Sequence, residues 1–476
     1  MMPRPAPSRL MVPILAASAI LAVVGLLAWA TLAGGNSPSS PTAPPIAGLP
    51  GAAAGQGGGG QATPAPLGSL PDDGAIGPGA SGPPSEPTGV PGAGSPTAGS
   101  GDGSGSTSPP LYVPRPTPTP APTPTPTPHP TPTPPPVQPA SGPSDQLRMH
   151  LVARITGGLT PKSVVATQTG LFFVQNMIYL HNVRVYNRQF QVVKTISDKV
   201  TLSDYGYTQY PHPVRGGPVE AAVTPDKSSV YVSNYAMFGP GFTHQGNDNC
   251  RPGQTIDRSF VYRIDLATLR KTGVTEVGST PKFLAVTPDG STLLVSNWCS
   301  GNVSIVNLGT FRETARITVG WHPRGIAFDA ASKTAYIAVW DLNAIAKINL
   351  STHAVSYIRN VGLNPRHLVI DPKGRYLYVS LDGAGQIAKL DLRTEHVVAR
   401  VHTGNEPRSM AIAADGRSLY VVNYSSATVS KVRTSDMHVI QVVNTDHHPI
   451  GVTYDAATRE VWVSCYSGTL RVYRDQ

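Results

Sequence analysis

Short runs of apolar and β-branched residues recur along the C-terminal two thirds of the chain. In one group the runs cover 325–328, 334–339, 344–349 and 354–359. These lengths and residue types suit strands and are too short for helices. Turn residues such as Pro-Asp-Gly at 288–290 and Asp-Gly at 415–416 separate the first two runs of a group. The pattern therefore predicts groups of four antiparallel strands.

A proline marks each group and sets the period of the repeat. It occurs at 281, 323, 365, 407 and 449, in steps of 42 residues. Equivalent prolines at 161 and 218 are followed by gaps of 57 and 63 residues, which correspond to one repeat plus insertions of 15 and 21. A period in this range, with short strands, is typical of a β-propeller, and seven repeats are present.

The two ends of this region complement each other. Only 27 residues remain after Pro449, so the last repeat is 14 residues short, and residues 147–160 supply 14. Within them 153–156 reads Ala-Arg-Ile-Thr, as does 315–318 in an intact repeat. We therefore expect an all-β, seven-bladed propeller of four-stranded blades. Its N-terminal strand completes the last blade and removes the open sheet edges.

The second strands carry a family resemblance. They include Tyr231-Val-Ser-Asn234, Leu294-Val-Ser-Asn297, Tyr378-Val-Ser-Leu381 and Tyr420-Val-Val-Asn423. These motifs resemble the YVTN β-propeller repeats of bacterial and archaeal surface proteins, over essentially all of 147–476. The first repeat departs most, with Phe-Phe-Val-Gln-Asn at 172–176. The resemblance implies the fold but not one function, because related propellers include surface-layer modules, a periplasmic single-stranded-DNA binder, lactonase-like enzymes and haem-bearing reductases.

The N-terminal region is of a different kind. Residues 10–33 carry no charge and follow Arg4 and Arg9, which predicts a membrane span with its N-terminus in the cytoplasm. We expect residues 1–35 to be a cytoplasmic stub and a transmembrane signal-anchor. The alternative is a cleavable signal peptide, because 28–30 reads Ala-Trp-Ala. The propeller is then extracytoplasmic, either held at the cell membrane by one helix or secreted.

Residues 36–146 predict a disordered linker between the anchor and the propeller of 147–476. From 36 to 145 there are 31 Pro and 20 Gly but a single aromatic residue, Tyr112, so too little apolar surface is present to support folding. Alternating Thr-Pro at 114–136 favours an extended polyproline II spacer.

Basic residues are concentrated in the propeller region. Residues 147–476 hold 34 Lys and Arg against 23 Asp and Glu, which favours anionic partners without choosing among them. Five of the seven residues that follow a repeat proline are cationic, namely Lys162, Lys282, Arg324, Arg366 and Arg408. Beside them lie His322, His367 and His448, and Glu220 and Glu406 interrupt the set. Two interpretations remain: a ligand-binding ring at the channel mouth, or cations paired with neighbouring carboxylates.

Aromatic residues occupy the end of the second strand on the same face. They are Tyr235, Trp298, Trp340, Tyr424 and Tyr466, and Asp382 is the exception. Such residues beside cations suit bases or sugars, whereas the alternative is packing between blades. The two insertions, at about 198–217 and 235–258, fall on this face as well, where loops commonly carry recognition but also tolerate neutral change.

The sequence has three cysteines, at 250, 299 and 465. Cys250 and Cys299 lie on corresponding loops of adjacent repeats, so they are the candidate disulfide in an oxidising compartment. Cys465 takes the place of an Asn in other repeats and is expected to be a buried thiol. Pairing of Cys250 with Cys465 stays open.

No catalytic motif emerges from the sequence. There is no Cys-x-x-Cys-His, no Gly-rich phosphate loop and no zinc-ligand spacing, so we predict no cofactor, metal site or catalytic residue. The leading hypothesis is a membrane-tethered binding or scaffold module for an anionic or glycan-like envelope polymer or a protein partner. The alternatives are a lactonase-like or lyase-like enzyme with a channel active site, and a single-stranded nucleic-acid binder, which is not favoured.

Overall fold

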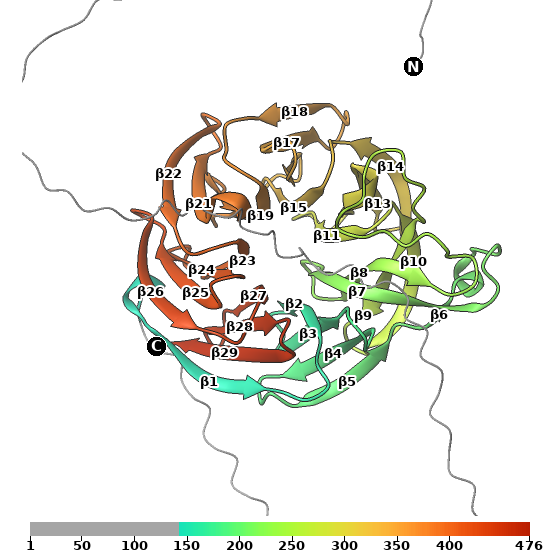
Figure 1. Cartoon of the computed structure of the whole chain (residues 1–476), viewed down its shortest axis with the longest axis horizontal. Coiled ribbons are helices and arrows are strands. Elements are labelled where there is room, and N and C mark those ends of the chain that lie inside the picture. The colour runs from blue at the N-terminus through green and yellow to red at the C-terminus, as the bar shows by residue number, and fades with distance from the viewer. Residues whose placement is uncertain (1–141) are drawn as a thin grey trace, which may run out of the picture. The chain divides into compact units, whose positions relative to one another are not determined.

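The computed structural model describes residues 142–476, which form seven antiparallel sheets around a central channel (Figure 1). This confirms the predicted all-β, seven-bladed propeller. The predicted signal-anchor and nearly all of the predicted linker lie outside the described residues. Within 142–476 no helix has the length and apolar character needed to cross a membrane.

The blades follow one another along the chain, and within each blade the strands follow in order from the channel outward. Blade one has β2 (Pro161–Ala166), β3 (Leu171–Asn176), β4 (Asn182–Asn187) and β5 (Val192–Ser197). Blade two has β7 (Pro213–Val223), β8 (Ser229–Phe238), β9 (Ser259–Asp265) and β10 (Arg270–Val277), with β6 (Val200–Thr201) added beside β7. Blade three has β11 (Pro281–Val286), β12 (Thr292–Asn297), β13 (Asn302–Asn307) and β14 (Arg312–Thr318). Blade four has β15 (Pro323–Phe328), β16 (Thr334–Val339), β17 (Ala344–Asn349) and β18 (Val355–Ile358).

The remaining blades have the same order. Blade five has β19 (Pro365–Ile370), β20 (Tyr376–Leu381), β21 (Gln386–Asp391) and β22 (His396–His402). Blade six has β23 (Pro407–Ile412), β24 (Ser418–Asn423), β25 (Thr428–Arg433) and β26 (His438–Asn444). Blade seven has β27 (Pro449–Asp455), β28 (Glu460–Cys465), β29 (Thr469–Asp475) and β1 (Met149–Ile155). Short 3-10 turns are η1 (Ser144–Gln146), η2 (Leu202–Tyr205), η3 (Trp298–Ser300) and η4 (Asp382–Ala384).

The burial of each strand depends on its distance from the channel. All six residues of β15 are buried, whereas β14, an outermost strand, alternates between exposed and covered positions. Inner strands are covered on both faces by the neighbouring blades, so they need continuous apolar runs, and an outer strand has one face in water. The core is therefore a series of interfaces between blades. Residues of β13 and β16, for example, pack together in one cluster.

Blade two departs from the regular repeat through the first insertion. The blade keeps its four predicted strands, but β7 and β8 extend beyond it as a long hairpin. The short strand β6 adds to the sheet beside the extended part of β7. Figure 1 shows this part projecting from one side of the ring. Tyr205, Tyr207 and Tyr210 pack into an apolar cluster there, and Tyr210 stacks on Phe242 of the second insertion at 4.7 Å between ring centroids. The two insertions are thus neighbours, joined by an apolar core of their own.

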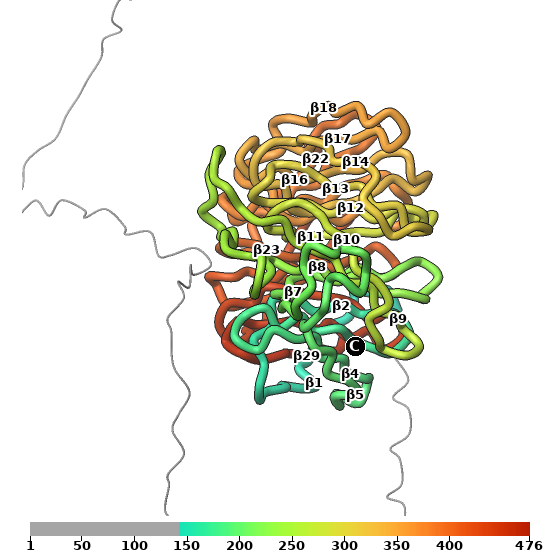
Figure 2. The backbone as a smooth tube through the Cα atoms, turned by 90° about the vertical axis from the view of Figure 1, so that its right-hand side faces the viewer, coloured from blue at the N-terminus to red at the C-terminus, as the bar shows by residue number. Residues whose placement is uncertain are grey.

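The ring closes where the first strand pairs with the last. β1 pairs with β29 in antiparallel register, from Met149 opposite Asp475 to Ile155 opposite Leu470, and the two strands lie side by side in Figure 2. This confirms the predicted completion of blade seven.

A buried ionic cluster ties this closure to blade six. Lys431 is ion-paired with Asp475, and both side chains are completely buried. The Tyr420 hydroxyl donates to Asp475 at 2.7 Å, and Lys431 Nζ donates to the carbonyl of Leu147 at 2.9 Å. Blade six, the last strand and the chain leading into β1 are therefore held by a single cluster.

Breaking one half of this cluster should destabilise the propeller strongly. We expect Asp475→Asn to cost about 3–5 kcal/mol of unfolding free energy, because it leaves the Lys431 charge buried without its counter-ion. Replacing both partners, as Lys431→Met with Asp475→Leu, should recover much of that loss. Urea unfolding of the two variants and the wild type measures this, and a single variant as stable as the wild type would contradict it.

Candidate functional site

Each innermost strand has a β-bulge directly after its repeat proline. In β2, Pro161 pairs with Asn176 and Ser163 pairs with Gln175, so Lys162 is the extra residue. The other six innermost strands shift register at the same place. A bulge re-aims the side chain of the residue that it contains. The five predicted cations therefore occupy an irregular position that the repeat reproduces in every blade.

The residue before the proline is equally unusual in five blades. Thr280, His322, Asn364, Glu406 and His448 have left-handed backbones, with φ between 51° and 58°. A following proline disfavours the right-handed helical region. Each of their carbonyls accepts the backbone N–H of residue 298, 340, 382, 424 or 466, at 2.9–3.2 Å. In these five blades the residue before the repeat proline is thus bonded directly to the end of the second strand, which is aromatic in every case except Asp382.

The five cations are buried, and none is more than 8% exposed. Lys282 is ion-paired with Asp248 of the second insertion. The carboxylate of Asp382 lies 3.7 Å from both Arg366 and Arg408, one on each side. Buried charges are tolerated only when they are compensated. The five positions therefore do not form one uniform ring at the mouth, because neighbouring carboxylates compensate part of it.

Aromatic faces accompany the cations. The pairs are Lys162 over Tyr466 at 5.0 Å, Lys282 over Trp298 at 4.7 Å, Arg324 over Trp298 at 5.4 Å and Arg408 over Tyr424 at 3.6 Å. Two of the rings also stack on a histidine of the next blade, Trp298 on His322 at 4.1 Å and Tyr424 on His448 at 4.5 Å. The aromatic positions thus pack between blades and, in the same place, lie beside cations.

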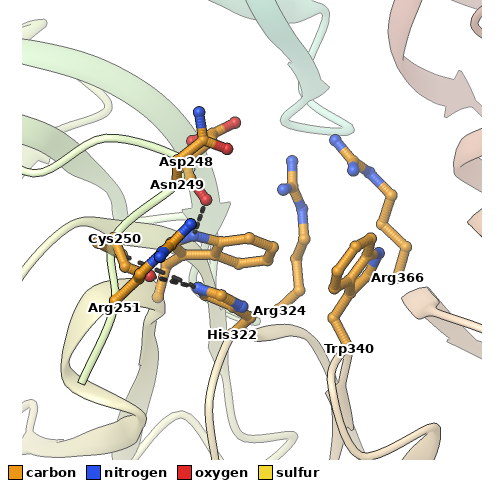
Figure 3. A pocket seen from close by; sticks show the side chains of 9 residues that line it. Asp248, Asn249, Cys250, Arg251, His322, Arg324, Trp340 and Arg366 are labelled. Atoms are coloured by element: carbon orange, nitrogen blue, oxygen red, sulfur yellow. Dashed lines mark hydrogen bonds between the residues drawn. The ribbon is translucent and has the colours of Figure 1, made fainter. Parts of the chain in front are cut away.

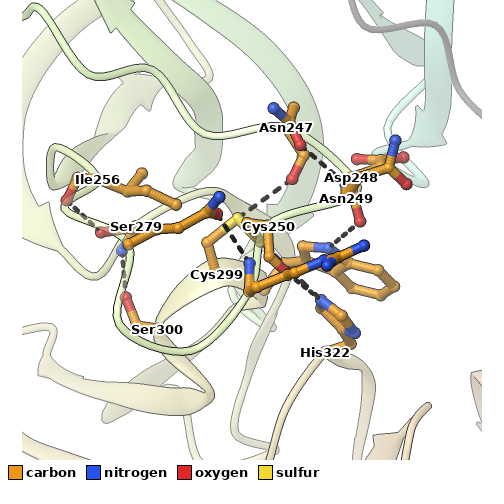
Figure 4. The surroundings of a disulfide bond; sticks show 12 residues. Asn247, Asp248, Asn249, Cys250, Ile256, Ser279, Cys299, Ser300 and His322 are labelled. Atoms are coloured by element: carbon orange, nitrogen blue, oxygen red, sulfur yellow. Dashed lines mark hydrogen bonds between the residues drawn. A yellow bond between two sulfur atoms is a disulfide. The ribbon is translucent and has the colours of Figure 1, made fainter.

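The second insertion folds over blades three and four. A disulfide joins Cys250 to Cys299 of η3, and Ser279 Oγ donates to the carbonyl of Ile256 at 3.0 Å (Figure 4). On its other side the Trp298 indole donates to the carbonyl of Asp248 at 3.1 Å. The insertion is therefore held at several points. Cys465 is a buried free thiol, and burial raises its pKa to about 11.

Beneath the insertion lies a cavity of about 390 Å³, which we call the arginine cavity. Its lining residues are Asp248, Asn249, Cys250, Arg251, Trp298, His322, Arg324, Trp340 and Arg366. Figure 3 shows the guanidinium groups of Arg324 and Arg366 pointing toward the same space, with Trp340 beside them. Three arginines line the cavity beside one carboxylate, that of Asp248, which is already paired with Lys282. Arg366 is in addition paired with Asp382, at 3.7 Å, outside the lining. The cavity is therefore electropositive and has aromatic walls.

Deeper in the channel, Glu220 and His367 occupy an environment that disfavours charge. Burial raises the pKa of Glu220 to about 7, against a hydrogen bond from Ser163 and the positive charges of Lys162 and Arg324. Burial also lowers the pKa of His367 to about 4, and Arg324 and Arg366 lower it further. His367 is therefore neutral at neutral pH.

The structure divides the predicted site residues into separate places. The arginine cavity takes up His322, Arg324, Trp340, Arg366 and Trp298, with Lys282 and Tyr235 against the same Asp248. Farther along the ring, Arg408 and His448 lie with Tyr424, and Lys162 lies with Tyr466; Asp382 links Arg408 to Arg366. The three histidines do not form a metal-binding group with the neighbouring acids anywhere in 142–476.

Sequence reasoning missed the contribution of the second insertion. Asp248, Asn249 and Arg251 line the cavity, but nothing in their local sequence distinguishes them from other loop residues. For Asp382 the sequence did contain a signal, because this residue interrupts the series of aromatic residues. Its significance depends on Arg366 and Arg408 lying on either side, which requires the ring.

One of the comparisons with known proteins, that with family models, supports the fold. A family model described as the cytochrome D1 heme domain, a propeller family, matches residues 366–471. Among solved structures, hydrazine synthase of Kuenenia stuttgartiensis matches with 17% identity and a TM-score of 0.49, covering 67% of this chain and 97% of that chain. No curated protein matches the chain. The family match spans 106 of 476 residues, so it agrees with a propeller and does not assign a family.

Reduction of the disulfide should loosen the second insertion. We expect Cys250→Ser with Cys299→Ser to lower the unfolding free energy by about 2–4 kcal/mol, because the bond closes a long loop in the unfolded chain. Proteinase K should then cut within 240–258. Adding a reductant should reproduce both effects in the wild type and leave the double variant unchanged. Three free thiols in unreduced wild type would contradict the bond.

Glu220 should make stability depend on pH. Its pKa is about 7 in the fold and near 4.5 for an ordinary Glu, so ionisation of the buried group opposes folding as pH rises from 4.5 to 7. We expect Glu220→Gln to raise the melting temperature by about 2–5 °C at pH 8 and to change little at pH 4. Calorimetry at both pH values tests this, and an equal effect at the two would contradict the assignment.

Proposed function

We propose that the propeller is a binding module for an acidic carbohydrate, a segment of an anionic glycan polymer held in the arginine cavity. The observation that carries this proposal is one cavity lined by three arginines and two indole rings, in which the guanidinium groups of Arg324 and Arg366 point toward the same space (Figure 3). Arginine recognises carboxylate, sulfate and phosphate through paired hydrogen bonds. Indole faces pack against the apolar face of a ring. An anionic sugar presents both features in one unit.

The dimensions of the cavity agree with this ligand class. A volume of about 390 Å³ lies within the range of small-molecule sites, roughly 300–1,000 Å³. Its walls come from three blades and one disulfide-bonded loop, so most of the site is preformed. Preformed sites bind with less loss of conformational entropy.

The chain enters the propeller on the face opposite the cavity. Ser144 donates through its backbone N–H and its hydroxyl to Asp415, both at 2.7 Å, and Arg459 donates to the carbonyl of Gly142 at 2.8 Å. Asp415 and Arg459 lie in turns between first and second strands, whereas the cavity lies at the other end of those strands. A linker to a membrane anchor would therefore join the propeller on the face opposite the cavity, and the cavity would face away from the point of attachment.

The family likeness raises haem as an alternative ligand, and the cavity does not fit it. Of the nine lining residues only Arg366 falls within the matched segment. The one histidine, His322, has its face stacked on Trp298. Its Nε2 lies 3.2 Å from the carbonyl of Cys250 and its Nδ1 lies 2.9 Å from Asp341, so both nitrogens are engaged by the protein. We derive no haem chemistry from this site.

Removing the arginines should abolish binding of acidic sugars. We expect the full-length protein to bind hyaluronan and polygalacturonate but not dextran, more weakly as salt rises. Arg324→Ala and Arg366→Ala should each weaken binding at least about tenfold, since a charge-assisted hydrogen bond is worth about 1.5–3 kcal/mol. Isothermal titration calorimetry measures this.

The matched control is Arg393→Ala, which removes an exposed arginine on the opposite face. Its affinity should equal that of the wild type. Equal binding of dextran and hyaluronan, or a loss in Arg393→Ala as large as in Arg324→Ala, would overturn the proposal. Tighter binding of a single-stranded oligonucleotide than of any glycan would replace it with nucleic-acid recognition.

A further inference from the structure

A second cavity of about 400 Å³ lies next to the arginine cavity, between blades four, five and six. Its lining residues are Trp340, Asn364, Asp382, Gly383, Ala384, Gly385, His402, Asn405 and Glu406. Its lining differs, with two carboxylates, two amides and an imidazole but no arginine or lysine. Outside the lining, Arg408 lies 3.7 Å from Asp382 and 3.6 Å from Glu406. We call it the carboxylate cavity.

Trp340 lines both cavities and is the wall that they share. Its indole N–H is buried and has no hydrogen-bond acceptor among the described residues. An unsatisfied buried donor is costly, and in a cavity wall it is the group that a ligand oxygen would satisfy. The boundary between the cavities therefore has an aromatic face and an open donor.

Asp382 connects the two cavities electrostatically. Its side chain is 7% exposed and lines the carboxylate cavity, and one oxygen lies 3.7 Å from Arg366 of the arginine cavity. The other oxygen, Oδ1, lies 3.7 Å from Arg408 and accepts no hydrogen bond among the described residues. A buried carboxylate oxygen of this kind is suited to accept a hydroxyl donor from a ligand.

The hollow itself exists because blade five has a small loop at this place. Residues 382–385 read Asp-Gly-Ala-Gly, where blade three has Trp-Cys-Ser-Gly and blade four has Trp-Asp-Leu-Asn. At Gly383 a Cβ atom would come 2.3 Å from Asn364 Oδ1, so a larger residue is excluded there. Asp382 and the small residues after it therefore leave space at the place where blades three and four have a tryptophan.

We infer that the two cavities are consecutive subsites for an oligosaccharide in which an anionic unit is followed by a neutral, hydroxyl-rich unit. The anionic unit lies in the arginine cavity, and the neutral unit lies in the carboxylate cavity across Trp340. This inference rests on the proposed function. It adds the order of the sugar units in the ligand and the minimum number of units.

The charge of the second cavity determines which unit it accepts. Asp382 and Glu406 accept hydrogen bonds from sugar hydroxyls, and the amides of Asn364 and Asn405 both donate and accept. A second acidic unit would bring a third carboxylate to a place where these two already share Arg408 as a counter-ion, so its charge would be poorly compensated there. The pair of subsites therefore selects an alternating polymer over a uniformly acidic one.

The experiment compares two tetrasaccharides on the full-length protein by calorimetry. Hyaluronan tetrasaccharide alternates glucuronate with N-acetylglucosamine, and tetragalacturonate is acidic at every unit. We expect the first to bind at least about tenfold more tightly. Asn405→Trp should fill the carboxylate cavity from an exposed position, lower the affinity for hyaluronan tetrasaccharide at least about tenfold and leave the affinity for free glucuronate unchanged.

Gln189→Trp, at an exposed position on the opposite face, is the matched control and should bind like the wild type. Equal affinity for the two tetrasaccharides, or no effect of Asn405→Trp, would overturn the second subsite while leaving the arginine cavity as an acidic-sugar site. Failure of glucuronate and both tetrasaccharides to bind would overturn the proposed function and this inference together.

Discussion

The pairing of β1 with β29 is the interaction on which the rest of the structure depends. It joins residues more than 300 positions apart and converts a row of sheets into a closed ring. Closure directs the innermost strand of every blade toward one axis, so that positions 42 residues apart in the chain become neighbours. The buried Lys431 and Asp475 pair and the hydroxyl of Tyr420 add a polar contact at the same seam. A buried pair of this kind specifies one register more than it adds stability.

Closure also creates an electrostatic difficulty, because it buries five cations at equivalent positions of the innermost strands. The structure offsets it locally in several ways. Asp248 and Asp382 provide carboxylates, and the rings of Trp298, Tyr424 and Tyr466 provide aromatic faces. The two carboxylates come from positions where the chain departs from its own repeat.

Those departures are also where the cavities lie. The second insertion covers blades three and four and forms one wall of the arginine cavity, and the small loop at 382–385 opens the carboxylate cavity. A repeat places equivalent side chains symmetrically, whereas a ligand of definite shape and charge needs an asymmetric site. In this propeller the residues that follow the repeat form the scaffold. The residues that depart from the repeat determine the shape and charge of the two cavities.

From the sequence alone came the number of blades, the strand bounds of the one repeat that was divided in detail, to within two residues, and the closure of the ring. The runs at 334–339 and 344–349 coincide with β16 and β17, because strand period and turn chemistry are local properties written in consecutive residues. It also named the cation and aromatic positions, but left open whether they bind a ligand or pair with each other. Only the tertiary structure decided that Asp248 reaches Lys282, that Asp382 lies between two arginines and that Trp340 separates two cavities. These relations join residues on different blades, and their distances arise only when the ring is closed.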